Sequence, residues 1–126
     1  MTLIIISKSA GTAGKRYSKM KYYRHMYFTE GLEKKKDKII KKLENKKFQV
    51  SIHLLVLPRN ENNQLEIINS VLLLQPDYPK EDYFVVGIAK SYDDALELVE
   101  KIAKEVYHET KGTDIRSYIL EKEQED

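Results

Sequence analysis

Residues 83–110 have the sequence YFVVGIAKSYDDALELVEKIAKEVYHET and decide the fold. The first seven, 83–89, are apolar and rich in β-branched and aromatic side chains, which predicts a short buried strand. A helix is predicted over 91–110, with Ser91 as its N-cap. Apolar residues recur at helical spacing and form the stripe expected to be buried: Ala95, Val99, Ile102, Ala103 and Val106. A strand followed by such a helix indicates a sheet covered by helices.

Two more strands are predicted upstream, joined as a hairpin. Residues 48–57 form a strand that becomes apolar on both faces, so it is expected to be central in its sheet. The cluster PRNENN at 58–63 favours a turn, and 65–69 returns as the partner strand. Residues 70–74 either continue this strand or form one helical turn. The alternative makes 64–74 a helix, with a β-α-β-α order and a partly parallel sheet.

Outside this centre, one more helix and one more strand are predicted. The helix runs from Thr29, its expected N-cap, to about Asn45, with Leu32, Ile39, Ile40 and Leu43 on one stripe. Residues 115–120 are predicted to be a last short strand, and 121–126 a solvated acidic tail.

These elements give an α+β fold with the order arm-α-β-β-β-α-β. A single domain over 20–120 is expected, with a small three- to four-stranded, mainly antiparallel sheet packed by two helices on one face. Residues 1–19 are expected to be a flexible accessory arm, in which 2–6 add an edge strand. Met20 is an alternative start, so the arm need not belong to the native product.

The composition excludes several classes of protein. The chain has no cysteine, which excludes disulfides, thiol nucleophiles and cysteine-ligated zinc, and which suits the reducing cytoplasm where we expect the protein. The longest apolar runs, 3–6 and 71–74, are far shorter than the roughly 20 residues that cross a bilayer, so no membrane span is predicted.

The charges divide the chain in two. Residues 1–48 carry 14 of the 22 Lys and Arg but only four of the 20 acids, a net charge of +10, whereas residues 49–126 have a net charge of −8. Such a division predicts a non-enzymatic interaction protein that self-associates or binds a protein partner, unless one half folds onto the other. An isologous dimer would pair the unlike patches twice.

The alternative partner is a nucleic acid. Basic residues and tyrosines interleave before residue 28. There, Lys and Arg would neutralise phosphates, and tyrosines would stack on unpaired nucleobases. The lysine face of the first helix extends this surface. The candidate contacts are Lys15, Arg16, Lys19, Lys21, Tyr22, Tyr23, Arg24, Lys34, Lys35 and Lys38. Against this interpretation, the tyrosines would pack on the sheet and leave only the Lys and Arg side chains in water.

No catalytic, cofactor-binding or metal-binding residues are predicted. The segment Gly11-Thr-Ala-Gly14-Lys15 has too few residues between its glycines for a phosphate loop, and Arg16 stands where Ser or Thr is needed. The three histidines are scattered. The remaining alternative is an enzyme whose site is assembled from residues distant in the sequence.

Two segments carry a resemblance. The core GIAKSYDDALELV and the end ETKGTDIRSY, within 83–118, resemble small uncharacterised, hypothetical proteins of Gram-positive, gut-type bacteria, and RHMYFTEGLEKKKDKIIKKL is similar to their N-terminal segment. The resemblance covers about Met20 to Leu120. It implies a stand-alone cytoplasmic protein and implies no activity.

Overall fold

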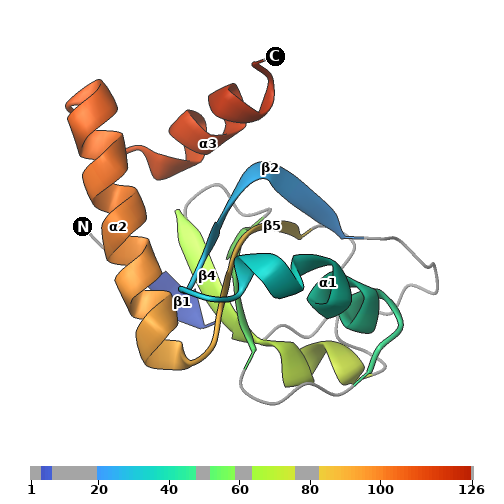
Figure 1. Cartoon of the computed structure of the whole chain (residues 1–126). Coiled ribbons are helices and arrows are strands. Elements are labelled where there is room, and N and C mark those ends of the chain that lie inside the picture. Colours follow the sequence, from blue (N-terminus) through green and yellow to red (C-terminus); the bar gives the residue numbers. More distant parts are fainter. Residues whose placement is uncertain (1–3, 7–19, 48–51, 59–63, 76–82, 126) are drawn as a thin grey trace.

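The computed structural model describes residues 4–6, 20–47, 52–58, 64–75 and 83–125. They form one five-stranded sheet with three α-helices (Figure 1). The strands are β1 (Ile4–Ile6), β2 (Lys21–Phe28), β3 (His53–Leu57), β4 (Leu65–Asn69) and β5 (Phe84–Ala89). The helices are α1 (Lys36–Glu44), α2 (Tyr92–Thr110) and α3 (Ile115–Glu123), with 3-10 turns η1 (Glu33–Lys35) and η2 (Ser70–Leu74).

The strand order is β1-β4-β3-β5-β2. β3 pairs antiparallel with β4 and β5, while β1 and β2 add in parallel at the two edges. The α+β class, the hairpin and the central position of β3 are therefore confirmed, and so is an edge strand within 2–6. The sheet is mixed. The alternative helix over 64–74 is wrong, because 65–69 is a strand and only 70–74 forms a helical turn.

Helices cover both faces of the sheet, so the prediction of helices on one face is wrong. Successive side chains of a strand point to opposite faces. Leu55 and Leu57 of β3 pack with α2 and α3, whereas Leu54 and Val56 pack with α1. Because β3 is apolar on both sides, each side needs a cover, and Figure 1 shows α2 and α1 on different sides of the sheet.

A bulge in β5 decides which of its residues face α2. Leu55 pairs with Gly87 and Val56 with Val85, so Val86 is an extra residue in the ladder. Val86 packs with α2, but Val85 and Ile88 both face α1. At Gly87 an added Cβ would lie 3.2 Å from the Tyr27 carbonyl oxygen, so glycine permits the close approach of β2.

The predicted strand over 115–120 is wrong, since these residues begin α3. Asp114 is the N-cap, and its carboxylate accepts hydrogen bonds from the backbone N–H of Ser117 at 3.1 Å and from its hydroxyl at 2.9 Å. The helix continues to Glu123, through half of the segment that was predicted to be a tail.

The first helix begins later than predicted. Gly31 has a φ of +90°, which interrupts the helix after Thr29, and α1 itself begins at Lys36. Thr29 is not its N-cap; the Thr29 hydroxyl oxygen instead accepts a hydrogen bond from the Lys90 N–H at 3.3 Å. Leu32, Ile39 and Leu43 are buried, as predicted. The strand β2 precedes this turn and was not predicted, although its tyrosines favour strands.

Candidate functional site

The structure divides the predicted nucleic-acid contacts between two places. Lys15, Arg16 and Lys19 lie outside the described residues. Lys21, Tyr22, Tyr23 and Arg24 belong to β2 at one edge of the sheet. Lys34 and Lys35 lie in η1 and Lys38 lies in α1.

The tyrosines of β2 pack in the core or hydrogen-bond to other elements of the protein. Tyr23 is 1% exposed and packs among aromatic rings, with ring centres 6.2 Å from Tyr27 and 6.0 Å from Phe84. Burial, helped by Glu105, raises its pKa to about 12. The Tyr23 ring therefore presents no exposed face on which a base could stack. The half-buried Tyr22 donates its hydroxyl to Glu44 of α1 at 2.5 Å.

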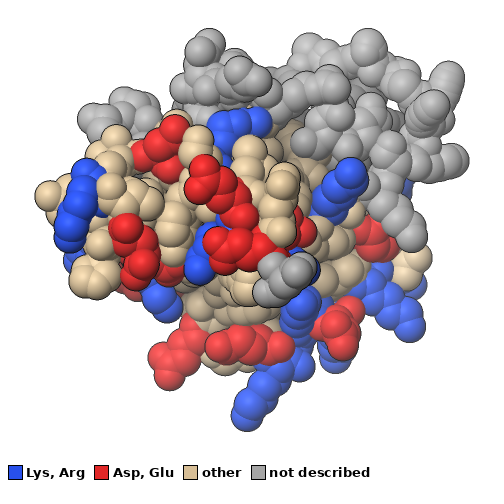
Figure 2. Space-filling model, turned by 90° about the horizontal axis from the view of Figure 1, so that it is seen from above, with Lys and Arg blue, Asp and Glu red and all other residues tan. Residues whose placement is uncertain are grey.

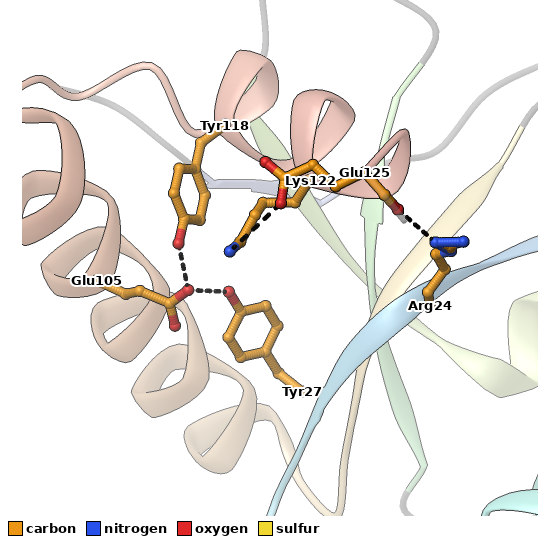
Figure 3. Close-up of polar contacts among 6 residues, drawn as sticks. All are labelled: Arg24, Tyr27, Glu105, Tyr118, Lys122 and Glu125. Carbon is orange, nitrogen blue, oxygen red and sulfur yellow. Dashed lines mark hydrogen bonds and ion pairs between the residues drawn. The ribbon is translucent and has the colours of Figure 1, made fainter.

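Arg24 contacts the end of α3 rather than solvent alone (Figure 3). Its backbone N–H donates to Glu123 Oε1 at 2.9 Å, and its guanidinium Nη1 donates to the backbone carbonyl of Glu125 at 2.6 Å. The basic half of the chain thus folds onto the acidic half at this point.

Glu105 of α2 joins three elements. Its Oε2 accepts hydrogen bonds from Tyr27 of β2 at 3.0 Å and from Tyr118 of α3 at 2.7 Å (Figure 3). Burial raises the pKa of both phenols above their usual value of 10, and the nearby Glu105 carboxylate adds to this. Both phenols therefore remain neutral donors. Sequence reasoning missed this cluster, because the three residues are far apart in the chain and no motif connects them.

Exposed lysines gather on the other face of the molecule. We call Lys34, Lys35, Lys38 and Lys41 the lysine surface; all four are exposed. None of them lies within 4.0 Å of a carboxylate oxygen in the described part of the chain. Residues 30–47 carry eight lysines and four acids. This surface therefore keeps an unneutralised positive charge.

Acidic side chains gather on α2 and α3. Residues 91–125 carry ten acids and five bases. We call six of the exposed acids the acidic surface: Asp93, Glu97, Glu100, Glu109, Asp114 and Glu121. Figure 2, which looks down on α3, shows acidic side chains gathered over this helix with basic ones around them. Since α1 packs on one face of the sheet and α2 and α3 on the other, the sheet separates the lysine surface from the acidic surface.

A hollow of about 510 Å³ lies beside the C-terminal half of α2 and the start of α3. Ala103 and Ile115 contribute apolar lining. Its two lysines already have partners: Lys104 lies 3.4 Å from a Glu100 carboxylate oxygen, and the Lys111 ammonium lies 5.8 Å from the ring centre of Tyr107. We assign it no chemical role.

The described ranges contain neither a cluster of metal-ligating side chains nor a helix that could cross a membrane. No group of three or more His, Asp or Glu side chains there has an arrangement suited to a metal ion. None of the helices in those ranges has both the length and the apolar character that crossing a membrane requires.

No family model, curated protein or solved structure matches this chain. The charged surfaces described above are therefore the basis for a functional proposal.

Proposed function

We propose that this protein is a non-enzymatic interaction module that self-associates through unlike charges. In this proposal the lysine surface of one copy lies against the acidic surface of another. The observation that supports it most directly is the separation of the two surfaces by the sheet, each with a surplus of one sign.

The placement of the surfaces favours a head-to-tail contact. An isologous interface uses the same patch on both copies. Unless the two surfaces were adjacent, it would therefore bring the lysine surfaces of the two copies together, or their acidic surfaces together. Here they lie on opposite faces of the sheet. A heterologous contact pairs them without this conflict, and each added copy leaves one surface open for the next.

The sheet edge supports a protein partner over a nucleic acid. Binding of single strands uses exposed aromatic rings, but Tyr23 is buried and the hydroxyls of Tyr22 and Tyr27 are bonded to carboxylates. Arg24 is engaged with α3. The lysine surface alone offers point charges, which suit an array of carboxylates as well as phosphates.

Sedimentation velocity of the purified protein tests the proposal at about 50 mM and about 500 mM salt, since salt screens exposed charges. We expect species larger than a monomer at low salt, growing with concentration past a dimer, and a monomer at high salt. The double variant Lys34→Glu/Lys38→Glu is expected to be monomeric at both salts, and so is Glu97→Lys/Glu100→Lys. An equimolar mixture of the two variants is expected to associate again.

Two results would contradict the proposal. One is a monomer at low salt and high concentration. The other is an oligomer that neither salt nor the charge reversals affect, which would point to an apolar interface. Fluorescence anisotropy with labelled single-stranded DNA, duplex DNA and RNA completes the experiment. Binding that weakens with salt and is lost in Lys34→Glu/Lys38→Glu, by a monomeric protein, would favour the nucleic-acid alternative.

A further inference from the structure

The outer edge of β2 is a second candidate interaction surface. β2 is the last strand in the order β1-β4-β3-β5-β2, so within the described residues its outer side has no neighbouring strand. A strand edge presents backbone donors and acceptors that another extended segment can pair with, and proteins commonly cover such edges. Here the end of α3 lies against it (Figure 3).

Two groups bind Arg24 at this edge, a carboxylate and a backbone carbonyl, and an acidic peptide carries both kinds of group. A carboxylate oxygen of Glu123 accepts the Arg24 backbone N–H at 2.9 Å, and a backbone carbonyl, that of Glu125, accepts from the Arg24 guanidinium at 2.6 Å. An acidic segment laid along β2 would supply the same two kinds of acceptor. Lys21, also exposed on β2, adds a second positive charge to this edge.

The two halves of α3 are held in different ways. In the first half, Ile115 and Ile119 are buried at 1% and 0% exposure, and Arg116 Nη1 donates to the Pro58 carbonyl at 2.6 Å. At the last turn and just past it, the contacts of Glu123 and Glu125 to Arg24 are polar and exposed to solvent. Exposed polar contacts contribute little stability, so the last turn can leave the edge while the buried half of α3 stays in place.

We propose that the edge of β2 around Arg24 binds an acidic, extended peptide segment of a partner protein, and that residues 123–125, at and just past the end of α3, are a built-in competitor for this site. The competitor is tethered, so it acts at a high effective concentration and keeps weak ligands out. The site uses Arg24 and the strand backbone, not the lysine surface. It therefore goes beyond the proposed self-association and does not depend on it.

Two-dimensional amide NMR with a synthetic peptide tests this proposal. The probe is EKEQED, the sequence of residues 121–126, and the control peptide is QKQQQN, which lacks the carboxylate side chains. We compare the full chain with a variant that ends at Lys122. In the shortened variant the EKEQED peptide is expected to shift the Arg24 amide signal and to bind at least about tenfold more tightly than to the full chain. The control peptide is expected to leave Arg24 unchanged.

A second variant, Glu123→Gln, keeps the full length of the chain and does not require the shortened protein to fold. We expect faster hydrogen exchange of the Arg24 amide in this variant, by several-fold, because a neutral amide is a weaker acceptor than a carboxylate. Glu121→Gln is the matched control, because Glu121 is exposed and the hydrogen bonds of Arg24 go to Glu123 and Glu125 instead.

The proposal is wrong if the EKEQED peptide leaves Arg24 unchanged in the shortened variant, or if it shifts Lys34 and Lys38 instead. It is also wrong if removal of the Glu123 carboxylate leaves the exchange of the Arg24 amide unchanged. Equal binding of the peptide to both chains would overturn the competitor role. None of these results depends on the oligomeric state, so failure here is distinguishable from failure of self-association.

Discussion

Lys111 ends α2 in a backbone conformation that usually belongs to glycine. Its φ is 62° and its ψ is 20°, in the left-handed region, where a Cβ atom is crowded. The glycine of this segment, Gly112, follows one residue later in the chain. The Lys111 N–H donates to the Tyr107 carbonyl at 2.8 Å, so the capping hydrogen bond is made and only the residue type at this position is unfavourable.

We expect Lys111→Gly to stabilise the protein by about 0.5–1 kcal/mol, because glycine adopts this conformation without the Cβ penalty. Lys101→Gly, the same change at an exposed position inside α2, is expected to destabilise by about 1 kcal/mol. Urea unfolding of the two variants measures both. A loss of stability in Lys111→Gly would show that the Lys111–Tyr107 ring contact outweighs the strain.

At the scale of elements, α3 shows why a short apolar segment is ambiguous. Ile115 and Ile119 are four residues apart, which places them on one face of a strand and also on one face of a helix. Burial of these two residues is therefore compatible with both predictions. The signal that separates them is Asp114, the N-cap, which was not recognised as a helix start.

We expect Ile119→Asp to destabilise the protein by more than about 3 kcal/mol, because it buries an unpaired charge in the core shared with α2. The neighbouring Leu120→Asp is expected to have little effect, since Leu120 is 40% exposed. Thermal melts followed by circular dichroism compare the two. Equal losses of stability would contradict the orientation of α3 described here.

At the scale of the whole molecule, phenol–carboxylate hydrogen bonds connect the layers. Tyr22 joins β2 to Glu44 of α1, and Tyr27 joins the same strand to Glu105 of α2. One strand is thus tied to helices on both faces of the sheet. Tyr118 adds α3 to the second of these contacts. The phenols of Tyr22, Tyr23, Tyr27 and Tyr118 all have raised pKa values, with burial as the largest cause.

The raised pKa values predict that stability decreases in alkali. Above pH 10 the phenols lose protons in the unfolded chain but keep them in the folded protein, so the unfolded state binds fewer protons and becomes favoured. For Tyr23 the stabilisation is complete below pH 10 and is lost as the pH rises through about 12.

Urea midpoints at several values between pH 9 and pH 12 measure this decrease. Tyr23→Phe keeps the buried ring and removes one proton site, so its stability is expected to fall less steeply with pH. Tyr107→Phe, at a ring that is 57% exposed, is the control and is expected to follow the parent protein. The explanation is wrong if Tyr23→Phe keeps the full slope.

The sequence by itself determined those elements whose signals are local. The N-cap of α2 and its apolar stripe specify a helix over 92–110 wherever it packs. The apolar run of β3 on both faces specified a central strand, and the turn cluster before β4 specified the hairpin. Hydrophobic periodicity and helix capping depend on residues only a few positions apart, so the sequence alone reveals them.

Tertiary structure alone decided the rest. The bulge at Val86 depends on the register between β3 and β5, and the face of the sheet that α3 covers depends on its packing against α2. The division of charge was plain in the sequence, but the sequence did not show which basic residues contact the acidic half and which remain exposed. Arg24 is hydrogen-bonded to residues at the end of the acidic half while the lysine surface remains open, because folding brought one basic segment beside the acidic helices and placed the other across the sheet.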